Sequence, residues 1–427
     1  MSDSDQRPLL SIVIPTRERG RYLEHSLNTA VACKDLRIEI VVSDNASQDN
    51  TTAIVAAKGD PRIRYIKTAE RVSVCRNFSS AFSNATGDYI LYVGDDDAVL
   101  PNGIEDLLAV LTDHKPDIVS WPEVSYEWPR DNADGLLRIR RRHLRGGVQS
   151  RDPTEFMQRI CAGETGIASV HCGCVSREIV HSVASKAGRY HYYTIPDASA
   201  FAALALAKSY IYLNRPVTVY GRSPASNTSA LLTAGSSAYA TFGRENASDA
   251  REEFLDLRCR SIFAFGFDGL LQTRRFFDLS GPPINFEKWK ERIAKDILSM
   301  RAEVRKEQVR FVNEWLEKND IAPLEIAPFK LAAAHASPPI TAAKRRRRKT
   351  SLRRIAIPAC QSFMPNVDAA VRVAEYVIGP DALTHKQPRL TSLTRWFGVA
   401  VRARLVSKLD GEKAARRLSS RRRTLQR

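Results

Sequence analysis

The stretch YILYVGDDDAVLP, from Tyr89 to Pro101, is the part of the sequence that decides the fold. Tyr89 to Val93 has the apolar and aromatic composition of a buried β-strand, and three consecutive aspartates follow it. Three adjacent carboxylates repel one another, so their position at the end of a buried strand requires a positively charged partner. The stretch therefore predicts a strand whose carboxyl end carries a functional acidic cluster.

Strands and helices alternate on the N-terminal side of this stretch. The predicted strands are Leu9–Ile14, Ile38–Val42 and Ile63–Ile66, and the predicted helices are Tyr22–Cys33, Thr51–Lys58 and Phe78–Asn84. Such alternation predicts an α/β fold, with a mostly parallel sheet flanked by helices. Ligands of such sheets bind at the carboxyl ends of the strands. We therefore expect the polar residues after three strands, Pro15–Arg17, Asp44–Asn45 and Asp95–Asp97, to converge on one edge.

The net charge of +17 is unevenly distributed over the 427 residues. Residues 336–427 contain 22 Lys and Arg but only 5 Asp and Glu, so they account for the whole excess, and residues 1–335 are neutral. The basic C-terminal part and the chemistry of the body are therefore separate questions. No stretch has the length and apolarity of a membrane-spanning helix, no secretory signal is recognisable, and seven cysteines without a framework spacing fit reduced thiols. We expect a cytoplasmic protein.

Composition divides the chain into four parts. Serine, proline and glycine accumulate around Ser223–Ser237, which predicts a domain boundary there. The predicted parts are a flexible N-terminus (1–8), an α/β domain with two halves (9–106 and 107–230), a helical extension (231–335), and a basic linker with an amphipathic tail (336–427).

Four motifs resemble one known family when they are taken together in order. They are SIVIPTRERGRYLEHSL, IVVSDNASQDNT, RVSVCRNFSSAFSNATGDYILYVGDDDAVLP and the helix start at Pro196-Asp197. They are similar to the family 2 inverting glycosyltransferases, continuously from about Leu9 to Asp106 and more thinly to about Ser229. The resemblance implies the GT-A fold, a nucleotide-diphospho-sugar donor and Mg²⁺ or Mn²⁺.

The aspartates are the predicted metal site. Hard divalent cations prefer carboxylate oxygens, and Mg²⁺ is often held by one or two carboxylates together with substrate phosphates. The resemblance implies that Asp96 touches the metal and that Asp95 lies near the ribose or at the second coordination position. The family motif is Asp-X-Asp, and here Gly94 occupies its first acidic place. The alternative is an acidic loop that caps the next helix, through Asp97 for example.

The resemblance also implies the residues that bind the nucleotide sugar, and they are Pro15, Thr16, Arg17, Glu18, Asp44, Asn45, Arg76 and Asp95. A carboxylate at Asp44 can accept a hydrogen bond from a base imide or a ribose hydroxyl, or it can simply form an Asx-turn. Arg76 can pair with the diphosphate or with the aspartate cluster, or it can form a purely structural ion pair.

An inverting transfer requires a base that removes the proton of the acceptor hydroxyl. The family places an aspartate at the start of a helix about a hundred residues after the metal motif, and Asp197 fits by position. Pro196 stands where the family often has an acid, and a helix N-cap is the alternative role for Asp197.

The basic tail contains an amphipathic segment. Leu393, Trp396, Phe397, Ala400, Val401, Leu405 and Leu409 recur at helical spacing beside arginines. Such a helix fits an anionic membrane surface, a docked C-terminal helix or, less well, nucleic acid.

Taken together, the sequence predicts a metal-dependent enzyme that transfers a sugar to a glycan or lipid-linked acceptor in polysaccharide or cell-envelope assembly. It would be cytoplasmic or peripheral on the inner face of the membrane. The alternatives are a catalytically silent nucleotide-sugar-binding module and a sugar nucleotidyltransferase.

Overall fold

A computed structural model describes most of the first 326 residues and two segments after them. The described residues are 7–130, 133–140, 146–164, 172–193, 197–226, 237–246, 249, 254–277, 281–326, 354–359 and 364–378. The predicted amphipathic segment from Leu393 to Leu409 and the basic runs lie outside these residues, so their partners stay a prediction. No helix within the described residues has the length and apolar character that crossing a membrane requires.

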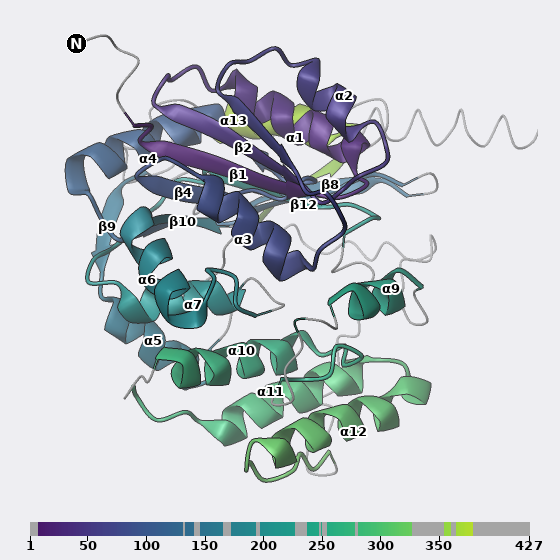
Figure 1. Cartoon of the computed structure of the whole chain (residues 1–427). Coiled ribbons are helices and arrows are strands. Elements are labelled where there is room, and N and C mark those ends of the chain that lie inside the picture. Colours follow the sequence, from purple (N-terminus) through teal and green to yellow (C-terminus); the bar gives the residue numbers. More distant parts are fainter. Residues whose placement is uncertain are drawn as a thin grey trace, which may run out of the picture.

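The centre of the molecule is an eight-stranded sheet with the order β3-β2-β1-β4-β10-β6-β11-β9 (Figure 1). Its strands are β1 (Leu10–Thr16), β2 (Ile38–Asp44), β3 (Ile63–Lys67), β4 (Tyr89–Tyr92), β6 (Ile118–Ser120), β9 (Val148–Arg151), β10 (Gly173–Ser176) and β11 (Tyr210–Leu213). The first four strands are parallel, whereas β10 and β9 run antiparallel to their neighbours. The predicted α/β fold with a mostly parallel sheet is confirmed.

Helices cover both faces of this sheet (Figure 1). The bounds are α1 (Gly20–Ala32), α2 (Thr51–Ala56), α3 (Val74–Asn84), α4 (Pro101–His114), α5 (Pro153–Cys161), α6 (Arg177–Ala187) and α7 (Asp197–Leu206). Successive residues of β1 enter opposite cores: Ile12 and Ile14 pack with α1 and α4, and Val13 packs on the side of α3. This explains the continuous apolar runs, because a strand buried on both faces has no polar side.

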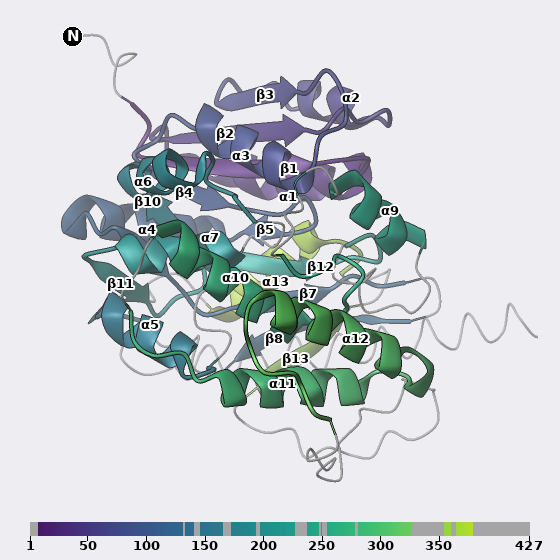
Figure 2. The same ribbon diagram turned by 60° about the horizontal axis from the view of Figure 1, so that its bottom comes forward.

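The helical extension packs on the side of α7 (Figure 2). It contains α9 (Ser237–Asn246), α10 (Ile262–Phe277), α11 (Phe286–Ser299) and α12 (Ala302–Lys318). Gly269 of α10 lies so close to α7 that a Cβ there would be 3.2 Å from the Cβ of Ala198. Trp289 and Trp315 are fully buried in the same core as the sheet. The extension thus shares one core with the α/β domain, and its predicted helical character is confirmed.

A second sheet of five strands lies beside the acidic motif. Its order is β13-β8-β7-β12-β5, with β5 (Ala98–Val99), β7 (Val124–Glu127), β8 (Gly135–Arg140), β12 (Thr218–Arg222) and β13 (Arg354–Ala359). β13 pairs antiparallel with β8, and α13 (Val367–Ile378) packs against α1 and β5. These two segments of the predicted linker and tail are folded parts of the body. The sequence did not indicate this because both are short and lie beyond a basic run.

His191 is fully enclosed by aromatic rings between α3 and α7. Its ring lies 4.7 Å from that of Phe82 and 5.4 Å from that of Phe78, and its Nδ1 is 2.9 Å from the hydroxyl of Ser199. Burial lowers the pKa of His191 to about 3, because a charged imidazolium would have no water around it. His191 is therefore a neutral packing residue.

We expect this histidine to make the fold sensitive to acid. Its pKa is lower in the folded chain than in the unfolded chain, so its contribution is complete above about pH 6.5 and is lost as the pH falls toward 3. The free energy of unfolding should fall by about 1.4 kcal/mol per pH unit in that window. Urea unfolding of the wild type and of His191→Phe, which keeps the aromatic packing, measures this. Identical pH slopes in the two proteins would contradict it.

Candidate functional site

The carboxyl ends of β1, β2 and β4 meet at one edge, as the sequence predicts. Thr16, the last residue of β1, donates a hydrogen bond of 2.8 Å from its hydroxyl to Oδ2 of Asp95, which follows β4. The two residues are 79 positions apart in the chain, and both are buried. Parallel pairing of β1 with β4 brings them together, because it aligns the ends of the two strands.

Asp95 has a second partner that sequence reasoning missed. Nη1 of Arg19 lies 3.1 Å from Oδ1 of Asp95, and another amine of the same guanidinium donates to the carbonyl of Ala225. Burial by itself would lower the pKa of Arg19, but the negative charges of Asp95 and Asp96 raise it above its usual value. Arg19 is therefore a permanent cation beside the acidic cluster. Its place just before α1, next to a predicted strand end, was the available signal.

Of the three aspartates, Asp96 has the carboxylate that accepts the fewest hydrogen bonds within the described part of the chain. Its Oδ2 accepts a hydrogen bond of 3.1 Å from the backbone N–H of Ser223, and its own carbonyl accepts one from the indole of Trp128. Among the described residues, no donor contacts its Oδ1. Burial, and then the charges of Asp97 and Asp95, raise the pKa of Asp96 to about 6. The positive charge of Arg19 and the hydrogen bond from Ser223 do not offset the burial of this carboxylate and the negative charges beside it.

Asp97 is a structural residue. Its two oxygens accept hydrogen bonds from the backbone N–H groups of Gly94 (2.9 Å) and Gly221 (2.7 Å). These bonds tie the acidic loop to β12 and close the turn that begins at Gly94. A Cβ on Gly94 would lie 2.8 Å from Oδ2 of Asp97, so the absence of the family's first acid has a steric explanation. A Cβ on Gly221 would lie 1.7 Å from the carbonyl of Asp96, so β12 also requires glycine.

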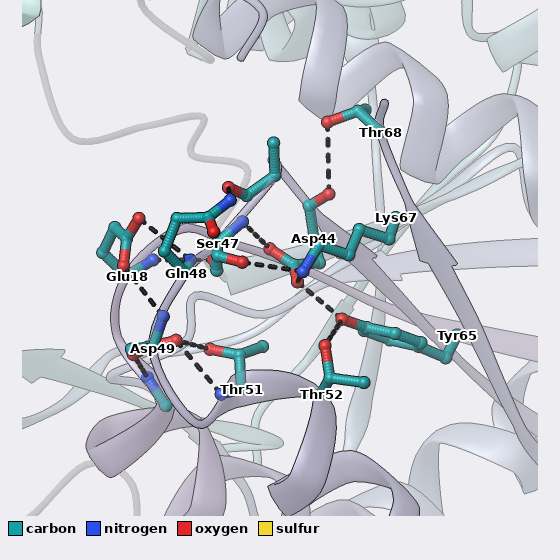
Figure 3. A network of polar contacts seen from close by, with 12 residues as sticks. Glu18, Asp44, Ser47, Gln48, Asp49, Thr51, Thr52, Tyr65, Lys67 and Thr68 are labelled. Carbon is teal, nitrogen blue, oxygen red and sulfur yellow. Dashed lines mark hydrogen bonds and ion pairs between the residues drawn. The ribbon is translucent and has the colours of Figure 1, made fainter. Parts of the chain in front are cut away.

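Asp44 is completely buried at the end of β2 (Figure 3). Its Oδ1 accepts a hydrogen bond of 2.9 Å from the N–H of Ser47, and its Oδ2 accepts one of 2.5 Å from the hydroxyl of Tyr65. Lys67 lies 3.9 Å away. Burial and the carboxylate of Asp44 raise the pKa of Tyr65 to about 12. In this arrangement the carboxylate of Asp44 closes a turn with Ser47 and ties that turn to Tyr65 of β3.

Glu18 organises the neighbouring loop (Figure 3). Its carboxylate accepts hydrogen bonds from the N–H groups of Gln48 (3.1 Å) and Asp49 (3.2 Å), and it pairs with Arg71 at 2.8 Å. The backbone of Glu18 has a φ of 52°, in the left-handed region that ordinary residues rarely adopt. The bonds across to the β2 loop hold this conformation.

The remaining predicted nucleotide residues divide into buried and open ones. Pro15 is part of the buried strand β1, and the side chain of Asn45 exchanges two hydrogen bonds of 2.8 Å with the backbone of Val72. Arg17 pairs with Glu245 of α9 and keeps 30% of its side chain exposed. Arg76 keeps 56% of its side chain exposed and pairs through Nε with Asp249, at 3.3 Å. The predicted contact of Arg76 with the aspartate cluster is not formed here.

Asp197 is the first residue of α7, as predicted. Its side chain lies outside what the structure describes, so its role as a base stays a prediction. The helix that it begins packs against α10 and α5, which holds its backbone in place.

The acidic cluster fits a divalent cation in its chemistry. It offers carboxylate oxygens, the ligands that Mg²⁺ and Mn²⁺ prefer, and one oxygen of Asp96 accepts no hydrogen bond from the part of the chain that the structure describes. Within the described residues, no three His, Cys, Asp or Glu side chains are placed to surround a metal ion. Such a cluster would supply part of a coordination shell, which donor phosphates and water would complete.

Comparison with known proteins finds a family model that matches this region. Residues 11–184, which include β1, β2, β4 and the acidic cluster, match the model of glycosyl transferase family 2. Over these residues, which are less than half of the chain, the sequence is similar to glycosyl transferase family 2. The match ends before α7 and the helical extension, so it covers the edge of the sheet where the predicted donor residues lie but not Asp197.

Curated glycosyltransferases are similar to part of this chain. The abequosyltransferase RfbV of Salmonella typhimurium is 35% identical over 115 residues, which are 26% of this chain and 34% of that protein. A GalNAc(5)-diNAcBac-PP-undecaprenol beta-1,3-glucosyltransferase of Campylobacter jejuni is 30% identical over 105 residues, 24% of this chain and 34% of that protein. The chain spans about a third of the length of the curated relatives it matches. A structure of S. aureus TarS with UDP-GlcNAc aligns over 72% of this chain and 81% of that chain, with 12% identity and a TM-score of 0.45.

Proposed function

We propose that the chain is an inverting glycosyltransferase that moves a sugar from a nucleotide-diphospho-sugar donor to an acceptor hydroxyl and requires Mg²⁺ or Mn²⁺. The observation that carries this proposal is the pair Asp95 and Asp96. Both are buried at the carboxyl edge of the sheet, inside the region that matches family 2, and Asp96 is under-compensated. A bound divalent cation would neutralise the departing diphosphate.

The residues at the edge have distinct proposed tasks. Thr16 and Arg19 fix Asp95, so that the acidic pair is preorganised before a ligand arrives. Arg17 and Arg76 have exposed guanidinium groups, which suit them to bind phosphate oxygens. Asp44, Asn45 and Glu18 hold the turns around the nucleotide, because their polar atoms are already used within the protein.

Asp197 is the proposed base. It would take the proton of the acceptor hydroxyl while that oxygen attacks the anomeric carbon from the side opposite the leaving diphosphate. A positioned base of this kind contributes roughly 10²–10⁴-fold to the rate. The relatives named above transfer sugars, and one acts on an undecaprenol-linked glycan according to its name. A glycan or lipid-linked acceptor in envelope assembly is the corresponding proposal for this chain.

One observation favours a second candidate, a silent nucleotide-sugar-binding module. Both oxygens of Asp95 are taken by Thr16 and Arg19, and both oxygens of Asp97 are taken by backbone N–H groups. These four of the six carboxylate oxygens of the cluster therefore already accept hydrogen bonds within the protein, which leaves fewer oxygens for a metal ion.

Donor turnover with and without metal separates the two functions. The purified full chain is incubated with a panel of UDP-, GDP- and TDP-sugars, and release of the nucleoside diphosphate is followed. We expect release in Mn²⁺ or Mg²⁺ and none in EDTA, with recovery when metal is restored. Full activity in EDTA would contradict metal dependence, whereas donor binding without release over a broad acceptor panel would favour the silent module.

A further inference from the structure

Asp249 joins the helical extension to the predicted donor site, although nothing in the sequence marks it. It lies just after α9, and its side chain is only 3% exposed. Its Oδ1 accepts hydrogen bonds from Nη2 of Arg189 (2.9 Å) and Nε of Arg76 (3.3 Å), and its Oδ2 accepts one from the hydroxyl of Ser73. A buried carboxylate with three donors is held in one orientation.

The contacts of Asp249 meet at the start of α3, on the edge where the acidic cluster lies. Ser73 is the N-cap of α3, and its hydroxyl also accepts from the N–H of Arg76. Asn246 of α9 accepts a hydrogen bond of 2.8 Å from the N–H of Val74, and Glu245 pairs with Arg17. Figure 2 shows α9 beside the end of β1. The extension thus reaches the donor edge through polar contacts.

The contact with Asp249 leaves the two terminal Nη amines of Arg76 available to a ligand. The contact uses Nε, and among the described residues no acceptor lies within hydrogen-bonding distance of the two Nη amines of Arg76. More than half of the side chain is exposed. A guanidinium restrained at Nε still presents its two terminal amines, and phosphate oxygens are bound by such forks in a bidentate manner.

We propose that Asp249 is a positioning residue that orients Arg76, together with Arg189, to bind the diphosphate of the donor. The proposal rests on the proposed function, because it assigns a diphosphate to this edge. It also gives the extension a task in donor binding, since α9 and Asp249 lie outside the part of the chain that matches family 2.

Positioning and simple electrostatics predict opposite results for the same substitution. Asp249→Asn removes a negative charge beside two arginines, so a purely Coulombic effect would tighten the binding of an anion. If Asp249 acts by orienting Arg76, the same change loosens the guanidinium and weakens binding. The sign of the change therefore decides between a positioning residue and a carboxylate that competes with the ligand.

The test measures the binding of inorganic pyrophosphate, with Mg²⁺, to the full chain by calorimetry. We expect Asp249→Asn and Arg76→Lys each to raise the Kd by about tenfold, since each removes an oriented charge-assisted hydrogen bond. The double variant should bind no more than about twofold more weakly than either single one, because both changes act through one guanidinium. Asp256→Asn is the matched control. It removes a carboxylate that pairs with Arg258 in the same extension, and it should leave the Kd unchanged.

Three outcomes would overturn the positioning role: tighter binding by Asp249→Asn, unchanged binding, or fully additive losses in the double variant. If Asp249→Asn lowers the melting temperature strongly, its Kd cannot be interpreted, and Arg76→Lys becomes the deciding variant. The side chain of Arg76 is exposed, so this substitution should leave the fold intact. Wild-type affinity of Arg76→Lys for pyrophosphate would overturn the proposal. A wild-type chain that binds neither pyrophosphate nor any nucleotide sugar would overturn the proposed function as well. Binding by the wild type with no effect of Asp249→Asn overturns the positioning role alone.

Discussion

Asp96→Asn is expected to abolish sugar transfer and, at the same time, to stabilise the metal-free fold. Transfer should fall by at least about 100-fold, because the substitution removes the carboxylate proposed to hold the cation that neutralises the leaving group. Stability should rise at pH 8 by up to about 3 kcal/mol, because burial and its acidic neighbours raise the pKa of Asp96 to about 6 and its charge is therefore costly. Donor turnover and urea unfolding in EDTA measure the two effects.

The neighbouring aspartate provides the control for this prediction. Asp97→Asn has the same change of charge, but Asp97 uses both oxygens to accept from the N–H groups of Gly94 and Gly221. An amide can accept at only one of these positions, so we expect a loss of roughly 1–3 kcal/mol of stability. Retained turnover in Asp96→Asn would contradict its role at the metal. Equal destabilisation by the two substitutions would show that Asp96 is only a structural residue.

A chain that ends at residue 350 is expected to lose its folded state. It lacks β13, which completes the second sheet, and α13, which buries Val367, Val371, Val377 and Ile378. Burial of each such side chain contributes roughly 1.5–3 kcal/mol, so their sum approaches the net stability of a typical domain. The loss would extend to the donor edge, because α13 packs against β5, directly after the acidic motif.

Polar contacts make the same truncation more damaging. Glu375 of α13 accepts a hydrogen bond of 3.0 Å from the N–H of Asn102, in the first turn of α4, and lies 3.7 Å from the buried guanidinium of Arg215. Circular dichroism and a thermal melt of the truncated chain check the prediction. A chain that ends at residue 378 keeps both elements, so it should melt cooperatively and at a higher temperature than the chain that ends at residue 350. A cooperative, unshifted melt of the shorter chain would contradict it.

The sequence by itself determined the first half of the fold and the place of the acidic site. Strands buried on both faces appear as continuous apolar runs, such as the one that ends at Pro15, and the residues after them are fixed at the carboxyl edge by parallel pairing. Local patterns of this kind need no knowledge of the rest of the chain. The α/β class and the meeting of Thr16 with Asp95 could therefore be predicted.

Only the tertiary structure decided what each polar residue does. Asp96 and Asp97 look alike in the sequence. In the fold, the N–H groups of Gly94 and Gly221 donate to both oxygens of Asp97, whereas burial and the neighbouring negative charges raise the pKa of Asp96. Arg76 pairs with a carboxylate 173 positions away, and β13 joins a sheet whose other strands lie more than 130 residues earlier. The reason is physical: hydrogen bonds and buried charges depend on distances across the fold, and a sequence pattern fixes only distances along the chain.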